Sequence, residues 1–104
     1  MFNIILKFHL DLIMESKFIL SDYIEAALKR AVYEKLDDGS YSGVIPECKG
    51  VIAFGSSLKD CEYQLRSVLE DWILLGLKLG HSIPVIDKID LNKKVENIES
   101  INSV

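Results

Sequence analysis

Apolar and polar side chains alternate along two short segments in the middle of the chain, residues 32–36 and 41–45. This alternation is typical of half-buried strands. The intervening residues 37–40 read Asp-Asp-Gly-Ser and tolerate the unusual dihedral angles of a hairpin turn. A loop over 46–50 begins with a proline, which cannot donate to a strand ladder, and leads to a third apolar segment at 51–54. The pattern predicts a three-stranded antiparallel meander.

A long helix is predicted after the meander, because apolar residues there step by three and four. Ser57, followed three residues later by Asp60, is typical of a capped helix start, and Gly80 with Pro84 predicts its end. The stripe that we expect to face the sheet comprises Leu58, Cys61, Leu65, Val68, Trp72, Leu75 and Leu79.

The second half of this helix is more apolar than one sheet face is expected to cover. We therefore predict that it also forms an interface between copies of the chain, with Leu69, Trp72, Ile73 and Leu77 as its candidate residues. Two interpretations of Trp72 stay open at this point. It is either a core residue under the sheet or a contact between helices across a dimer, where large aromatic side chains concentrate binding energy.

A shorter helix is predicted before the strands, near 21–30, with Ser21 as its cap, and residues 85–87 are predicted as a fourth strand. The expected fold class is α+β: a small antiparallel three-stranded meander plus a short fourth strand, packed on one long helix, with an additional N-terminal helix.

One folded domain is expected over residues 21–91. We predict an extension of uncertain order over 1–20 and a flexible polar tail over 92–104. The apolar segment 1–14 lacks the basic start and the cleavage site of a signal peptide. It is also shorter than the roughly 20 residues of a membrane-spanning helix. It is either a peripheral element or an extension upstream of a natural start at Met14.

The charge of the chain limits its partners. Twelve Lys and Arg residues against sixteen Asp and Glu residues leave a net charge of −4, the wrong sign for a domain whose main task is to bind phosphates. Autonomous nucleic-acid binding is therefore disfavoured, and a basic protein partner is favoured. The two cysteines are too few for a secreted disulfide framework, so we expect a cytoplasmic protein that does not bind membranes.

We predict no catalytic, metal or cofactor site. His9 and His81 are isolated, and neither Cys48, expected to be exposed, nor Cys61, expected in the core, has a base beside it. A nuclease would need several carboxylates on neighbouring elements, and Glu34 is the only acidic residue at the centre of a predicted strand.

The segment from Asp38 to Leu58, DGSYSGVIPECKGVIAFGSSL, resembles the signature of the HicB-like antitoxin family. The shared features are a hairpin, a Pro-Glu-x-x-Gly loop, a short strand and a Gly-x-Ser helix start. The spacing of Leu65, Leu69 and Trp72 and the stretch from Gly80 to Pro84 match the same family. The resemblance covers about residues 31–87.

This resemblance implies a degenerate ribonuclease H-like fold, a homodimer or higher homo-oligomer, and binding to a small basic HicA-type toxin that cleaves messenger RNA. The candidate partner contacts are Glu34, Tyr41, Pro46 and Glu47, on a sheet edge and loop expected to cover the toxin's RNA-binding surface. The chain departs from the family at Cys48 and Lys49, which replace a usual Leu-Pro pair.

Only 24 residues follow Gly80, so we expect no appended DNA-binding module and no autonomous DNA binding. Two alternatives to an antitoxin stay open. One is a residual metal-dependent ribonuclease H-like nuclease, and the other is an orphan domain whose only activity is self-association.

Overall fold

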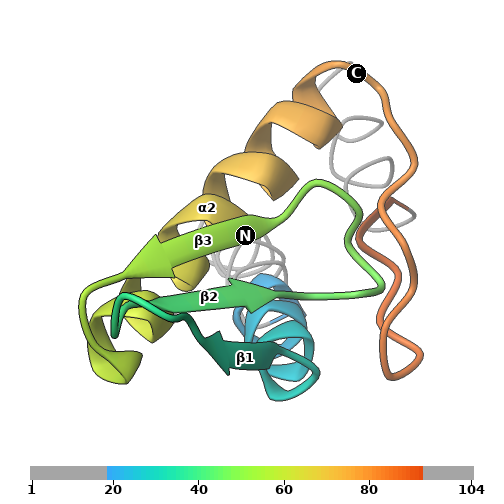
Figure 1. The fold of residues 1–104 in the computed structure, drawn as a ribbon. Helices are drawn as coiled ribbons and strands as arrows, with labels where there is room; N and C mark the ends of the chain where they lie inside the picture. Colours follow the sequence, from blue (N-terminus) through green and yellow to red (C-terminus); the bar gives the residue numbers. More distant parts are fainter. Residues whose placement is uncertain (1–18, 93–104) are drawn as a thin grey trace, which may run out of the picture.

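The computed structural model describes residues 19–92, which form a sheet with helices on one of its faces (Figure 1). An N-terminal helix occupies 19–29. Three strands follow, β1 at Val32–Lys35, β2 at Tyr41–Val44 and β3 at Ile52–Gly55, and then the long helix α2 at Leu58–Lys78. The strands are antiparallel neighbours in the order β1-β2-β3, so the predicted meander is confirmed.

The turn between β1 and β2 has the expected chemistry. Gly39 has a φ of 87°, and the Asp38 carboxylate accepts hydrogen bonds from the backbone and the hydroxyl of Ser40. Glycine adopts positive φ without steric cost, and an Asp side chain stabilises such turns locally. These bonds hold the pKa of Asp38 below its usual value.

Helix α2 begins where the sequence predicts. The Ser57 hydroxyl accepts a hydrogen bond from the Asp60 backbone N–H at 3.0 Å, and the Asp60 carboxylate accepts one from the Ser56 N–H at 2.9 Å. This reciprocal capping confirms the predicted pair. The helix ends at the cap residue Leu79, and Gly80 follows with a φ of 75°, the usual place for a glycine after a helix.

The sheet and α2 are in close contact at Gly55. A Cβ atom added there would lie 2.3 Å from the backbone nitrogen of Cys61, so only glycine fits. Gly43, on the neighbouring strand, is similarly confined by the ring of Tyr33. These contacts hold the start of α2 directly under β3.

The face of α2 that meets the sheet differs from the predicted stripe. Its buried residues are Cys61, Leu65, Leu69, Ile73 and Gly76. Leu58, Leu75 and Leu79 of the predicted stripe are exposed, and Val68 and Trp72 are half-buried. The reason is rotation about the helix axis: several overlapping apolar stripes fit the periodicity, and the close contact at Gly55 selects one of them.

The predicted fourth strand is wrong. Within residues 19–92, Ile86 forms only an isolated bridge with Ile89. Asp87 and Lys88 between them both have positive φ values, 49° and 66°, so the chain reverses there instead of extending along the sheet. Ser21 is also not a cap, because the chain is already helical at residue 19.

Two of the sequence predictions concern residues outside those described. They are His9 and the nature of the 1–14 segment, and most of the predicted extension and tail lies there too. Among residues 19–92, no helix is long and apolar enough to cross a membrane.

Candidate protein-binding surfaces

The face of the sheet opposite the helices is open and largely apolar. The strand register places Val32, Val44 and Ile52 side by side across the three strands, with Glu34, Ser42 and Phe54 in the next row. Val32 is 56%, Ile52 48% and Phe54 59% exposed. An antiparallel sheet with one solvated face usually alternates to polar residues on that face. Exposed apolar residues gathered on one sheet face are typical of an interaction surface.

Glu34 is the only charged side chain in these two rows of the open face, and no ion pair of Glu34 is found within the described residues. The open face therefore combines apolar side chains with one available carboxylate. Tyr41, also predicted as a partner contact, lies on the helix-facing side in a row with Lys35 and Gly55, and it is half-buried. The structure thus separates Glu34 and Tyr41 onto opposite faces.

Pro46 is exposed immediately beyond β2, but Glu47 beside it is already bound within the chain. The Glu47 carboxylate accepts a hydrogen bond from Arg30 at 2.7 Å, and Arg30 donates a second bond to Asp87 at 2.6 Å. These bonds from Arg30 hold the pKa of Glu47 below its usual value. Glu47 therefore holds its own loop in place through Arg30, while its side chain stays partly exposed; its role as a partner contact stays a prediction.

Arg30 joins three segments: the end of the N-terminal helix, the 46–50 loop and the turn at 87–88. The sequence analysis did not single it out. Its partners lie 17 and 57 positions away along the chain, and no local pattern marks such pairs. The pairs are solvent-exposed, so they position the loop more than they stabilise the fold.

Cys48 was predicted to be exposed, and this is wrong: its exposed fraction is 0%. It lies beside Tyr23, whose hydroxyl donates a 2.6 Å hydrogen bond to the Pro84 carbonyl. Burial raises the pKa of the Cys48 thiol, which disfavours the reactive thiolate. Cys61 is buried in the core as predicted. Both cysteines therefore have packing roles.

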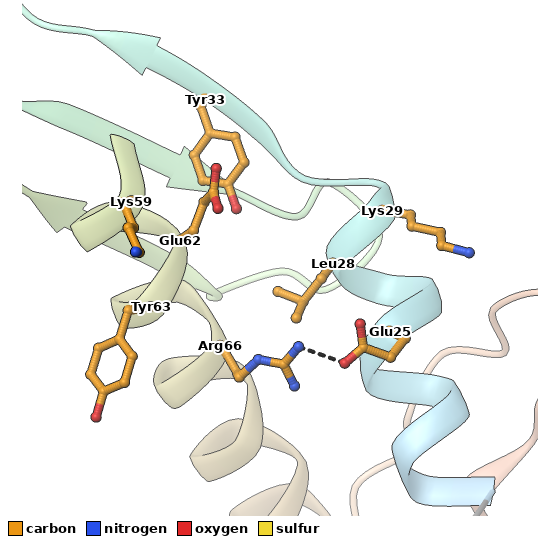
Figure 2. Close-up of a pocket in the computed structure, with 8 residues that line it drawn as sticks. All are labelled: Glu25, Leu28, Lys29, Tyr33, Lys59, Glu62, Tyr63 and Arg66. Atoms are coloured by element: carbon orange, nitrogen blue, oxygen red, sulfur yellow. Dashed lines mark hydrogen bonds and ion pairs between the residues drawn. The ribbon is translucent and has the colours of Figure 1, made fainter. Parts of the chain in front are cut away.

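A groove of about 450 Å³ lies beneath β1 (Figure 2). It exists because α2 packs under β3 and β2 but makes little contact with β1. Tyr33 reaches into it from β1, and burial raises the pKa of this phenol. An ion pair between Arg66 of α2 and Glu25 of the N-terminal helix crosses it. The remaining lining residues are Leu28, Lys29, Lys59, Glu62 and Tyr63.

The lining of this groove carries three cationic and two anionic side chains, so it has little net charge. Lys29, Lys59 and Arg66 oppose Glu25 and Glu62. Such a mixture gives no strong preference for an anionic or a cationic ligand. The groove is therefore a polar flank of the domain and a weaker candidate than the open sheet face.

The described residues also contain no group of three or more His, Cys, Asp or Glu side chains placed to hold a metal ion. Glu34 lies on the open face of the sheet, and the acidic residues of α2 lie on the other side of it. The sheet therefore separates the carboxylates that a two-metal nuclease would need together.

The candidate oligomer contacts need a correction. Leu69 and Ile73 are buried in the core of a single chain, so they present no surface to a second copy. Leu77 and Trp72 are partly buried and pack against that core. Trp72 also lines a groove together with Lys49 of the 46–50 loop and residues of the 81–84 segment. The exposed apolar residues of this part of α2 are instead Leu74 and Leu75.

Comparison with known proteins agrees with this arrangement. The sequence model of the UPF0150-like family matches residues 22–84, which include the sheet and α2. The chain belongs to the UPF0150-like family. Its HicB-like signature is thereby confirmed as a family relationship.

A solved structure supports the same assignment. This chain is similar to TTHA0281 from Thermus thermophilus, with 42% sequence identity and a TM-score of 0.65. The match covers 69% of this chain and 90% of TTHA0281. None of the curated proteins is similar enough to count as a relative.

Proposed function

We propose that this UPF0150-like protein is a noncatalytic antitoxin that binds and neutralises a small basic HicA-type toxin on the open face of its sheet. The observation that carries the proposal is the composition of that face: Val32, Ile52 and Phe54 are exposed around Glu34, with no cation in either row. Family membership supports the type of partner.

The physics of the surface favours a basic partner with apolar contacts. Burial of the apolar side chains supplies affinity, at roughly 25 cal/mol for each Å² removed from water. A Lys or Arg residue of the toxin pairs with Glu34 as the interface loses water. The net charge of −4 also speeds the encounter with a cationic protein.

Neutralisation follows from coverage of the toxin. A toxin that cleaves RNA needs a cationic surface for phosphates, and that surface is what an acidic protein attracts. Once the toxin's RNA-binding surface lies on the sheet, RNA is excluded by competition. This mechanism needs no bond-breaking chemistry from the antitoxin.

The test is co-expression with a small basic protein encoded beside this gene, followed by measurement of affinity and RNA cleavage. A stable complex with suppressed cleavage is the expected result. Glu34→Lys should weaken the complex at least about tenfold, as expected for a charge reversal at an interface. Glu62→Lys is the matched control, because it makes the same charge change on α2 and should alter affinity less than about twofold.

Two outcomes would overturn the proposal. One is failure to bind any small basic partner while the chain still self-associates, the behaviour of an orphan scaffold. The other is magnesium-dependent RNA cleavage by this chain alone that is lost in Glu34→Ala, the behaviour of a residual nuclease.

A further inference from the structure

Within residues 19–92, the outer edge of β3 has unpaired backbone groups at two defined residues. The Ile45 N–H donates to the Val51 carbonyl, and the register of β2 and β3 continues from this pair. Backbone bonds alternate along an antiparallel ladder, so Ala53 directs its N–H and C=O toward β2. Ile52 and Phe54 therefore direct theirs away from the sheet.

This edge lacks the usual protection against pairing. Natural edge strands are blocked by charged side chains, proline or a covering segment. The four residues of β3 include no charge and no proline, and no other strand pairs with this edge within residues 19–92. The opposite edge, β1, carries Glu34 and Lys35 in a strand of the same length.

The flank of α2 next to β3 also carries apolar side chains, with the exposed Asp71 at its outer border. One side of its buried stripe faces the groove under β1, through Glu62 and Arg66. The other side therefore lies beyond the β3 edge, where helical spacing places Val68, Trp72 and Leu75 in a line. Val68 and Trp72 are half-buried and Leu75 is largely exposed.

We propose that this surface pairs with a second copy of the chain, β3 against β3 in antiparallel orientation. A two-fold axis at Ala53 lets Ile52 of each copy exchange both backbone hydrogen bonds with Phe54 of the other. It also places each Ile52 side chain directly across from a Phe54 ring, and an aromatic side chain opposite a β-branched one is a favourable cross-strand pair. The two sheets become one continuous sheet, with α2 of each copy flanking the join.

Charge favours a second copy of the chain as the partner at the β3 edge. Each chain carries a net charge of −4, so two copies repel wherever charged surfaces meet. The β3 strand itself carries no charge, so pairing of its backbone brings no like charges directly together, and a two-fold contact must be complementary to itself. A basic partner gains no ion pair from β3, whereas it can gain one at Glu34.

Sedimentation of the full chain tests this pairing through matched variants. Phe54→Lys places a charge on the β3 edge, and Val32→Lys places the same charge on the β1 edge of the same face at nearly equal exposure. The wild type should dimerise at micromolar concentration. Phe54→Lys should raise the dimer dissociation constant at least about tenfold, and Val32→Lys should change it less than about twofold.

Circular dichroism of all three proteins verifies that the variants are folded. A wild type that stays monomeric at about 100 µM would overturn the proposal, since a specific dimer forms well below that concentration. A dimer that Phe54→Lys leaves intact, or that both variants weaken equally, would overturn it too.

Discussion

The two edges of this small sheet differ in nearly every physical respect. Under β3, helix α2 lies so close that Gly55 has no room for a side chain. Under β1 there is a groove, bridged by the Arg66–Glu25 ion pair. The β1 strand carries charges, and β3 carries none. One edge is thus loosely supported and polar, and the other is tightly supported and apolar.

This difference suits the two edges of the sheet to different kinds of contact. A rigid, uncharged edge is suited to backbone pairing, because the strand is already held in position before it meets its partner. A charged edge resists such pairing. The open face between the two edges is the surface on which the proposed toxin would bind.

The largest expected effect concerns close packing under β3. Gly55→Ala should lower the free energy of unfolding by about 3 kcal/mol, because the added Cβ meets the Cys61 backbone, which cannot move aside. Lys35→Ala, in the same row of the sheet on β1, should change it by less than about 0.5 kcal/mol. Urea denaturation of both variants measures the contrast, and equal losses would contradict it.

The rotation of α2 gives the next prediction. Leu69→Ala should also cost about 3 kcal/mol of folding stability, because a fully buried leucine leaves a cavity. Leu75→Ala should change folding stability by less than about 0.5 kcal/mol and should instead weaken self-association. Urea denaturation and sedimentation separate the two effects. A larger folding cost at Leu75 would mean that the helix presents another face to the sheet.

The capped start of α2 beneath β3 should make the folding stability depend on pH in the acidic range. Hydrogen bonds from Ser56 and Gln64 hold the pKa of Asp60 below its usual value. A carboxylate whose pKa is lowered by folding stabilises the fold at pH values above its unfolded-state pKa of about 4. This stabilisation is lost as the pH falls through the lower pKa of the folded state. The urea midpoint of Asp60→Asn should therefore fall less than that of the wild type between about pH 5 and pH 2. Parallel pH profiles would show that this cap does not contribute.

The smallest effect is expected on the β1 side. Arg66→Ala removes an ion pair whose two side chains are about half-exposed, so the loss should be about 0.5 kcal/mol at low salt. Salt at about 1 M should abolish the difference by screening. Thermal denaturation at the two ionic strengths measures it, and a loss that persists in high salt would indicate packing by the arginine stem instead.

Local chemistry made most of the architecture predictable from the sequence. The Asp38-Gly39 turn, the alternation on both sides of it and the Ser57–Asp60 cap each act through neighbours within a few residues. The prediction of a fourth strand was wrong because local composition did not reveal a chain reversal. Residues 85–87 have strand-like composition, but the positive φ values of Asp87 and Lys88 reverse the chain.

The surfaces were less predictable, because they depend on distant contacts. Periodicity identified α2 but could not fix its rotation, so Leu69 and Ile73 were assigned to an interface although they lie in the core. The ion pair of Glu47 with Arg30 was not predicted, because 17 positions separate the two residues along the chain. Glu34 was correctly predicted to lie at the centre of a strand, because strand alternation is a local pattern. The strand register then puts its side chain on the open face.

Residue-resolved amide hydrogen exchange on the full chain tests the contrast between the edges most directly. The Leu36 N–H donates to the Ser40 carbonyl, so the alternation along β1 leaves the amides of Tyr33 and Lys35 facing outward, as those of Ile52 and Phe54 do on β3. If copies pair through β3, the Ile52 and Phe54 amides should exchange at least about 100-fold more slowly than the Tyr33 and Lys35 amides, and dilution should remove the difference. Equally fast exchange of all four amides at about 100 µM protein would contradict pairing through β3.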